Sequence, residues 1–289
     1  MKLNKMSANF AMLTATIIWA STFIAIKKSL VGVHAVTLVC YRFALATFIM
    51  AIVLLFLRKK LWQHFKEGLI LGLLLFASYV TQAIALYYML IVDGGFITGL
   101  FVIFVAILSF ICGREKLRWN IVVAIVLAGI GLWVVTDGIK SFKWGDSLML
   151  LSAVMFAGHI LYADTVVKKW DVWVLNFQQF LVATLASLFC ILLFKLSFAV
   201  AAWDVIGWII YLAVFANVLC YAIQLSVQKI ISPTVFSLTV SLEPIFIAIF
   251  AWTIGGEKII MTDLIGGGMI VAAIIFAQIF RKEEMVQIG

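Results

Sequence analysis

The sequence predicts an all-α membrane protein in which ten transmembrane helices form two inverted five-helix repeats. Three observations support this prediction: the apolar composition, the chain length and an internal repeat. Of the 289 residues, 66% are hydrophobic and only 12% are charged, whereas about 25% of residues are charged in soluble domains. Since a membrane helix needs about 20 apolar residues, ten spans with short connections fill the chain and leave no room for a sizeable soluble domain.

Long apolar segments give the expected positions of the spans. These are residues 10–28, 35–57, 67–90, 94–112, 119–136, 145–165, 174–195, 205–228, 234–254 and 263–280. The first segment follows two lysines, as the apolar part of a signal peptide does. Its apolar run is longer than that of a signal peptide, and no small-residue cleavage site follows it. We therefore expect the first segment to be retained as a helix.

The positive charges predict the orientation of the spans, because Lys and Arg concentrate on the cytoplasmic side of membrane proteins. With the N-terminus inside, fourteen of the 21 lysines and arginines face the cytoplasm, six face outside and Arg42 lies within a span. We therefore expect an inner-membrane protein with both termini in the cytoplasm. The net charge of +8 is then a matter of orientation, and we expect no nucleic-acid partner.

Other motifs argue against an enzyme or an ATP-driven pump. The four cysteines, at positions 40, 112, 190 and 220, have neither metal-ligand nor redox spacing. No nucleotide-binding glycine loop is evident. No nucleophile with a base, paired carboxylates or metal cluster falls within a shared polar segment. We expect no enzymatic activity, no metal and no cofactor.

An internal repeat divides the chain into two halves. Residues 104–107 and 113–116 (Phe-Val-Ala-Ile and Gly-Arg-Glu-Lys) recur as 246–249 and 255–258 (Phe-Ile-Ala-Ile and Gly-Gly-Glu-Lys), a shift of 142 positions. Two further matches follow the same order: 76–86 with 215–225, shifted by 139, and 43–47 with 180–184, shifted by 137. The order and the similar shifts predict one repeat at 1–140 and a second at 141–289.

The number of spans per repeat predicts how the halves are related. Five is odd, so the second half enters the membrane from the opposite side and is inverted. Inverted repeats are a hallmark of secondary transporters, whose site lies near the membrane midplane between the halves. Duplication also builds other membrane proteins, so a non-transporting scaffold or chaperone subunit is the alternative.

Several segments resemble a known family. Residues 242–246 (Leu-Glu-Pro-Ile-Phe) and 255–258 are similar to the hallmark of the ninth span in EamA-like members of the drug/metabolite transporter superfamily. Residues 19–23, 41–43 and 145–146 extend the resemblance over the whole chain. The resemblance implies a ten-helix bundle with a central cavity that mostly exports amino acids and other small metabolites.

The two halves differ at the most distinctive part of this motif. The first half has Phe101 and Val102 where the second has Glu243 and Pro244. A proline-dependent irregularity is therefore expected in one half only. The missing N–H of Pro244 should leave a carbonyl near Val240 without its helical partner, which predicts a local break in the helix.

Polar side chains within the spans are candidates for substrate binding, because lipid cannot satisfy them. In the eighth span, Asn217, Tyr221, Gln224 and Gln228 are spaced by 4, 3 and 4 residues, which places them on one helical face. Gln82 is the repeat equivalent of Tyr221. Buried amides that hold helices together would give the same pattern, but the number of polar groups favours a cavity.

Trp19 and His159 lie centrally in the first and sixth spans. The Trp19 ring is expected in a cavity wall, unless its N–H bonds to the carbonyl of a neighbouring helix. A histidine that serves only in packing is the alternative for His159. Its repeat equivalent is Thr22, another polar residue, and this match favours the cavity.

Glu243 is the clearest charge near the membrane midplane, where a carboxylate costs about 2.5 to 3.5 kcal/mol. It must therefore be protonated, paired or hydrated. It is a candidate for binding an ammonium group or carrying a coupling proton, and the alternative is a structural role in which it pairs with Arg42 or with backbone groups. Arg42 lies nearer the outer face, and we expect its side chain to snorkel towards water.

Small residues in the fifth and tenth spans, within 124–131 and 266–272, predict close helix packing. Packing within a monomer and contact within a homodimer would both explain them. Glu115 and Glu257 end the fourth and ninth spans at opposite membrane faces, and we interpret them as helix caps or anchors between helices.

These observations predict a secondary transporter that exports small amino-acid-like or cationic metabolites by alternating access, with proton exchange and facilitated transport both left open. Its expected partners are the lipid bilayer, a small-molecule substrate and, in the first case, protons. Glu243 is the candidate coupling or cation-binding residue and Pro244 the candidate helix break. The candidate substrate-binding residues are Trp19, Thr22, Tyr79, Gln82, Thr98, His159, Tyr162, Asn217, Tyr221, Gln224 and Ser241.

Overall fold

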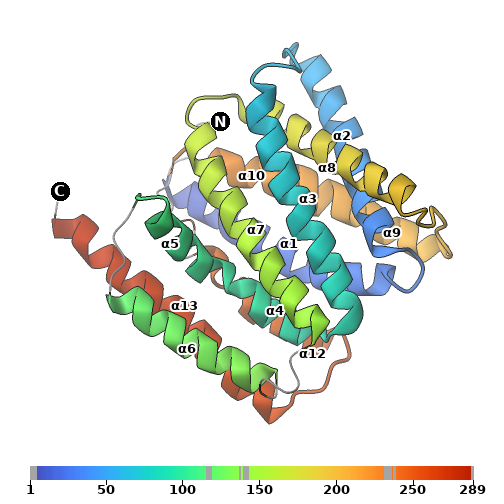
Figure 1. Ribbon diagram of the computed structural model, residues 1–289. Helices are drawn as coiled ribbons and strands as arrows, with labels where there is room; N and C mark the ends of the chain where they lie inside the picture. The colour runs from blue at the N-terminus through green and yellow to red at the C-terminus, as the bar shows by residue number, and fades with distance from the viewer. Residues whose placement is uncertain are drawn as a thin grey trace.

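The described part of the chain is a bundle of helices (Figure 1). A computed structural model describes residues 5–114, 119–136, 138, 143–230, 236 and 239–287, and the side chains of 5, 6 and 278–287 are excluded. Among these residues there is no β-strand. Some predictions fall outside this description: the side of the membrane expected for Lys2, Lys5, Lys116, Arg118, Lys140, Arg281 and Lys282, the role of Glu115 and the start of a span at Thr234.

The helices of the first half are α1 (Lys5–Ser29), α2 (Ala35–Phe56), α3 (Phe65–Tyr88), α4 (Ile91–Gly99), α5 (Phe101–Ile111) and α6 (Trp119–Val135). Those of the second half are α7 (Trp144–Val166), α8 (Val172–Leu193), α9 (Trp203–Tyr211), the π-helix η2 (Leu212–Leu219), α10 (Cys220–Val227), α12 (Glu243–Thr253) and α13 (Met261–Gln287).

Seven of the described helical segments are long and apolar enough to cross a membrane. They confirm the prediction of an all-helical, multi-pass membrane protein. The other three predicted spans coincide with shorter apolar helices at Trp119–Val135, Glu243–Thr253 and Met261–Ala277. The count of ten spans stays a prediction.

Helix α8 shows how polar groups fix a helix end outside the apolar segments. The Asp171 carboxylate accepts hydrogen bonds from the backbone N–H groups of Trp173, at 3.0 Å, and Val174, at 3.3 Å. It also accepts a bond of 2.6 Å from the Lys59 ammonium, which follows α2. Burial by itself would raise the pKa of Asp171, but these donors outweigh burial and hold the pKa below its ordinary value.

The two halves pack against each other through matching helices. Helix α2 packs on α8, α4 on α12 and α6 on α13. Between α2 and α8, repeat-equivalent residues touch: the rings of Phe43 and Phe180 lie 5.7 Å apart, and the hydroxyls of Thr47 and Thr184 lie 3.3 Å apart. Each half therefore contributes the same residues to this contact.

The fourth span is also interrupted in the first half, where no proline lies, so irregular backbone is not limited to the half that contains Pro244. Helix α4 ends at Gly99 and α5 begins at Phe101, the repeat equivalent of Glu243, where α12 begins. At this break, backbone hydrogen bonds join residues three apart in the sequence: Leu100 N–H donates to Ile97 O, and Ile103 N–H donates to Leu100 O. These bonds between residues three apart tighten the turn without a proline.

Pro244 lies in the first turn of α12, directly after the turn at residues 241–242. No intrahelical bond needs its N–H at this position, so the start of this helix costs no hydrogen bond. The ring of Pro244 packs directly on Gly99, and a Cβ at Gly99 would collide with it. The breaks in the two halves therefore lie against each other.

The eighth predicted span is not a regular α-helix. The π-helix η2 separates α9 from α10, and each of its bonds encloses one more residue than an α-helical bond. Asn217, in η2, therefore does not keep the alignment with Tyr221 and Gln224 that a spacing of 3.6 residues per turn predicts.

Glycines bring α6 and α13 into backbone contact. A Cβ at Gly131 would lie 2.7 Å from the carbonyl oxygen of Gly266, and a Cβ at Gly266 would lie 2.8 Å from that of Gly131. The structure thus accounts for these glycines by packing within one chain. Gly129, on another face of α6, has nothing within 4 Å of the position that a Cβ would occupy.

This packing predicts that Gly131→Ala destabilises the protein by about 1 to 3 kcal/mol, because the added methyl overpacks two rigid backbones. Gly129→Ala is the matched control in the same helix and should leave the melting temperature unchanged or slightly higher. Thermal unfolding of the purified variants in one detergent measures the difference. Equal melting temperatures for the two variants would contradict the proposed contact.

Candidate functional site

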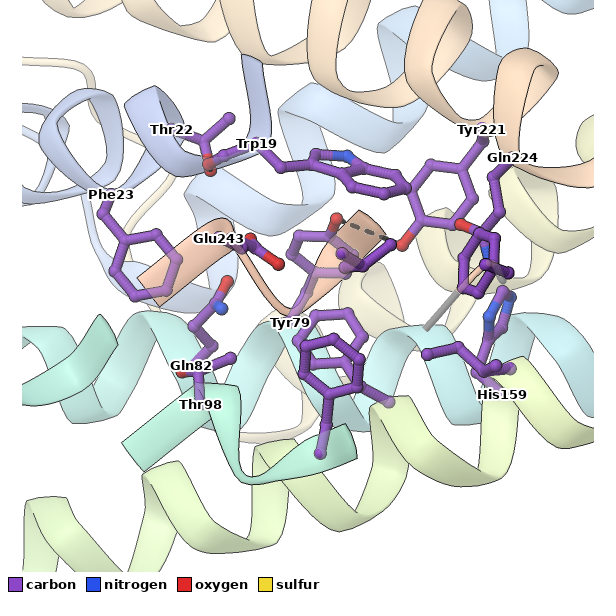
Figure 2. A pocket seen from close by; sticks show the side chains of 15 residues that line it. Trp19, Thr22, Phe23, Tyr79, Gln82, Thr98, His159, Tyr221, Gln224 and Glu243 are labelled. Atoms are coloured by element: carbon purple, nitrogen blue, oxygen red, sulfur yellow. Dashed lines mark hydrogen bonds between the residues drawn. The ribbon is translucent and has the colours of Figure 1, made fainter. Parts of the chain in front are cut away.

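A small cavity lies inside the bundle, between α1, α3, α4, α5, α7, α10 and α12 (Figure 2). The centre of a water molecule can occupy about 50 Å³ of it. This volume is well below the roughly 300 to 1,000 Å³ of typical small-molecule pockets, so the cavity as it stands is small for a metabolite. A larger ligand would require the surrounding helices to move apart.

Nine of the thirteen predicted site residues lie on the wall of this cavity. They are Trp19, Thr22, Tyr79, Gln82, Thr98, His159, Tyr221, Gln224 and Glu243. All nine are at most 9% exposed. The structure thus gathers most of the polar side chains predicted from separate spans around one space.

Three repeat-equivalent pairs contribute to the wall. Thr22 and His159 come from α1 and α7, Gln82 and Tyr221 from α3 and α10, and Phe101 and Glu243 from the starts of α5 and α12. Both halves therefore supply matching positions, but the second half supplies the residues with more acid–base chemistry.

Glu243 is the one charged side chain among the described residues that line the cavity. It begins α12, and the positive end of a helix dipole stabilises a carboxylate in the first turn. Figure 2 shows it among Thr22, Gln82 and Tyr79. A positively charged or proton-donating group in the cavity could therefore reach it.

Aromatic rings from both halves meet on one side of the cavity. The Tyr221 hydroxyl donates to the Tyr79 hydroxyl at 3.1 Å, and Trp19 stands edge-on to Tyr221 with 5.5 Å between ring centroids. The indole N–H of Trp19 donates to the carbonyl of Ala216 in η2 at 3.0 Å. Both interpretations of Trp19 thus hold in part: its ring lines the cavity, and its N–H bonds to a neighbouring helix.

His159 is held by a chain of amides from α8. Its Nε2 lies 2.8 Å from the Gln179 side-chain oxygen, which can only accept, so Nε2 carries a proton. The Gln179 amide nitrogen in turn donates to the oxygen of Asn176 at 2.7 Å. The sequence analysis missed Gln179 and Asn176, although the polar run 176–179 in a predicted span could have indicated them.

Arg42 does not snorkel, and that prediction is wrong. Its side chain is 1% exposed because it turns inward, where its guanidinium donates to the Asn217 oxygen at 2.6 Å. The guanidinium also lies over the Tyr79 ring, 4.4 Å from the centroid, as a cation–π contact requires. Within the described residues no ion pair joins Arg42 to Glu243, so the predicted alternative pairing is not observed.

Four predicted site residues do not lie on the cavity wall. Asn217 is turned towards Arg42, and its amide nitrogen donates to the Arg42 carbonyl at 3.3 Å. Tyr162 packs on the apolar cluster that includes Leu71. Ser241 is buried in the turn before α12, and Pro244 contacts Gly99 of α4.

Six apolar residues complete the wall, and the sequence analysis did not single them out for the cavity: Phe23, Phe101, Phe156, Ile160, Phe236 and Val240. In a membrane span, an apolar residue that faces a cavity has the same sequence signal as one that faces lipid. Only contacts in the folded chain distinguish the two.

An apolar helical bundle with a buried polar cavity between its two halves defines a membrane protein of the transporter class. The chain belongs to the EamA-like transporter family, whose model matches it twice, at residues 6–137 and 143–278. These matches confirm the resemblance predicted from the sequence motifs.

Similar proteins agree with this assignment. One protein of Archaeoglobus fulgidus, named as an uncharacterized transporter, is 25% identical over 283 residues, which are 95% of this chain and 87% of the relative. A second, with the same description and organism, is 25% identical over 279 residues, covering 89% and 92%. A crystal structure of another protein has the same fold, with a TM-score of 0.70 over 97% of this chain and 99% of its own, at 17% identity.

The Arg42–Asn217 bond predicts an unfolding effect. Asn217→Leu should destabilise the protein by about 1.5 to 3 kcal/mol, because it leaves a buried guanidinium without its acceptor. Gln228→Leu is the matched control: this amide, in the same predicted span, makes one neutral bond of 3.5 Å and should cost less. Thermal unfolding of both variants provides the comparison.

The double variant Arg42→Leu with Asn217→Leu tests whether the two residues act together. Its cost should fall short of the sum of the single costs by about 1 kcal/mol or more, as expected for residues in contact. Strictly additive costs would show that the bond contributes nothing specific.

Proposed function

We propose that the protein is a secondary transporter of the cell (inner) membrane that exports amino acids or similar small metabolites by alternating access. The observation that carries this proposal is the central cavity, because three repeat-equivalent pairs from the two halves line it. A site on a pseudo-two-fold axis between repeats is the arrangement that alternating access uses.

The proposal includes ten spans in two inverted repeats, 1–140 and 141–289. The two matches of the family model, at 6–137 and 143–278, support the duplication. The contacts of Phe43 with Phe180 and of Thr47 with Thr184 support a two-fold relation, since equivalent residues meet only near such an axis. Five spans per repeat would then make the second half inverted.

The size of the cavity supports a conformational cycle. At about 50 Å³, it cannot admit a metabolite unless one half moves relative to the other. We assign this structure to a closed state of the cycle. In the proposed orientation, both termini lie in the cytoplasm, as the distribution of Lys and Arg indicates.

Glu243 is the proposed coupling group. A carboxylate at membrane depth is stable when a proton or a substrate cation neutralises it, so the two would compete for one site. Export of a substrate with an ammonium group would then be accompanied by proton entry. Facilitated transport without proton coupling is the alternative, and it assigns Glu243 to substrate binding alone.

Glu243→Gln separates these mechanisms in proteoliposomes, using whichever radiolabelled compound of a broad amino-acid and metabolite panel shows counterflow. Under proton exchange, the rate of uptake driven by a pH gradient should fall about tenfold or more in the variant, the change that 1.4 kcal/mol produces. Counterflow should be retained. Glu67→Gln is the matched control, since Glu67 also lies in the first turn of a helix, α3, and does not line the cavity.

Other outcomes exclude parts of the proposal. Loss of both activities in a folded Glu243→Gln variant would assign Glu243 to substrate binding, and no change in either would remove it from the mechanism. Absence of counterflow for the whole panel with folded wild-type protein would contradict the transport proposal itself.

A further inference from the structure

Four charge-assisted hydrogen bonds gather at the short connection between α3 and α4. The Glu257 carboxylate, in the connection from α12 to α13, accepts from the backbone N–H of Ile91 at 2.6 Å and of Val92 at 3.0 Å. The Lys27 ammonium, in the last turn of α1, donates to the carbonyls of Leu86 at 2.7 Å and Met89 at 2.6 Å.

Each charge matches the helix end that it touches. Glu257 sits at the start of α4, where free N–H groups favour an anion, and Lys27 sits at the end of α3, where free carbonyls favour a cation. We refer to Lys27, Glu257 and the connection between α3 and α4 as the clamp. It joins the ends of α1, α3, α4 and α12, all of which contribute residues to the central cavity.

The clamp lies between the central cavity and a wide vestibule. On α1, Phe23 lines the cavity and Lys27 lines the vestibule; on α3, Gln82 lines the cavity and Tyr87 the vestibule. Four or five residues of α-helix span about 6 to 8 Å, so this short stretch of α1 and α3 separates the two spaces. The centre of a water molecule can occupy about 740 Å³ of the vestibule and about 50 Å³ of the cavity.

A second connection between the halves lies at the other end of the bundle. Arg114 follows α5 and donates to the Leu161 carbonyl of α7 at 3.0 Å and to the Thr165 hydroxyl at 3.3 Å. Arg114 and Glu257 belong to the two copies of the repeated motif, at 113–116 and 255–258. Each copy thus ties its own half to the other half, at opposite ends of the cavity.

We propose that Lys27 and Glu257 form a gate that closes the cavity towards the vestibule. This inference rests on the proposed alternating-access function. Opening on this side requires the bonds of Glu257 to α4 to break, because they are the part of the clamp that joins the two halves. Lys27 holds the end of α3 in place and attracts Glu257 electrostatically.

Cysteine accessibility tests the gate without any substrate. In a background in which the four native cysteines are replaced by alanine, Thr98→Cys places a single thiol on the cavity wall. A membrane-impermeant sulfonated maleimide is applied to either side of sealed vesicles that contain the full chain. A Lys258→Cys variant in the same background shows which side carries the connection between α12 and α13.

From that side, Glu257→Gln and Lys27→Met should each raise the labelling rate of the cavity thiol about tenfold, the population change that 1.4 kcal/mol produces. Lys27→Arg keeps the charge and should label like the parent. Lys258→Gln is the matched control, because Lys258 is exposed beside Glu257. Arg114→Gln should raise labelling from the opposite side and lower it from the vestibule side.

The gate is overturned if neither Glu257→Gln nor Lys27→Met raises the labelling rate from the vestibule side above that of Lys258→Gln. After labelling in vesicles, each variant is solubilised and only its monodisperse fraction is counted. It is also overturned if the increase occurs only from the opposite side. The transport proposal is tested separately. If the cavity opens as described but the protein shows no counterflow, the proposed transport function is refuted and the gate is not.

Discussion

The structure depends on one constraint, which is that backbone N–H and C=O groups inside a membrane must find partners within the protein. Regular helices meet it by themselves. Where the described helices depart from α geometry, other parts of the chain cover the backbone: Leu100 is 5% exposed, and the Ala216 carbonyl in η2 receives the Trp19 indole. These two irregular segments adjoin the cavity wall, because Phe101 follows Leu100 and the ring of Trp19 lines the cavity.

The buried charge of Arg42 follows the same logic and links the cavity wall to the interface between the halves. An unpaired guanidinium in lipid is costly, and here its partners are the Asn217 amide and the Tyr79 ring. Tyr79 in turn receives a hydrogen bond from Tyr221. One charge outside the cavity thus holds two rings that line it, one from each half, and a change at this interface would alter the shape of the site.

The sequence predicts those features that contrast with their surroundings. Polar residues such as Gln82, His159 and Gln224 stand out in apolar spans, and most of those predicted do line the cavity. The inward turn of Arg42 depends on Asn217, which is far away in the chain, and no local pattern indicates it. The break at Leu100 has no proline to mark it. The sequence of η2 does not distinguish a π-helix from an α-helix, so a prediction based on 3.6 residues per turn misplaces Asn217.

Divergence between the repeats determines what a duplicated backbone can do. If the halves were identical, the states open to either side of the membrane would have equal energies. They differ at the positions that matter for closure: Glu257 ties the halves through the amides at the start of α4, whereas Arg114 does so through a carbonyl and a hydroxyl of α7. In the proposed alternating-access cycle, unequal bonds at the two ends would give the two states different populations. A few side chains at the helix ends would then set the resting state, and the fold that the two halves share would provide the two states.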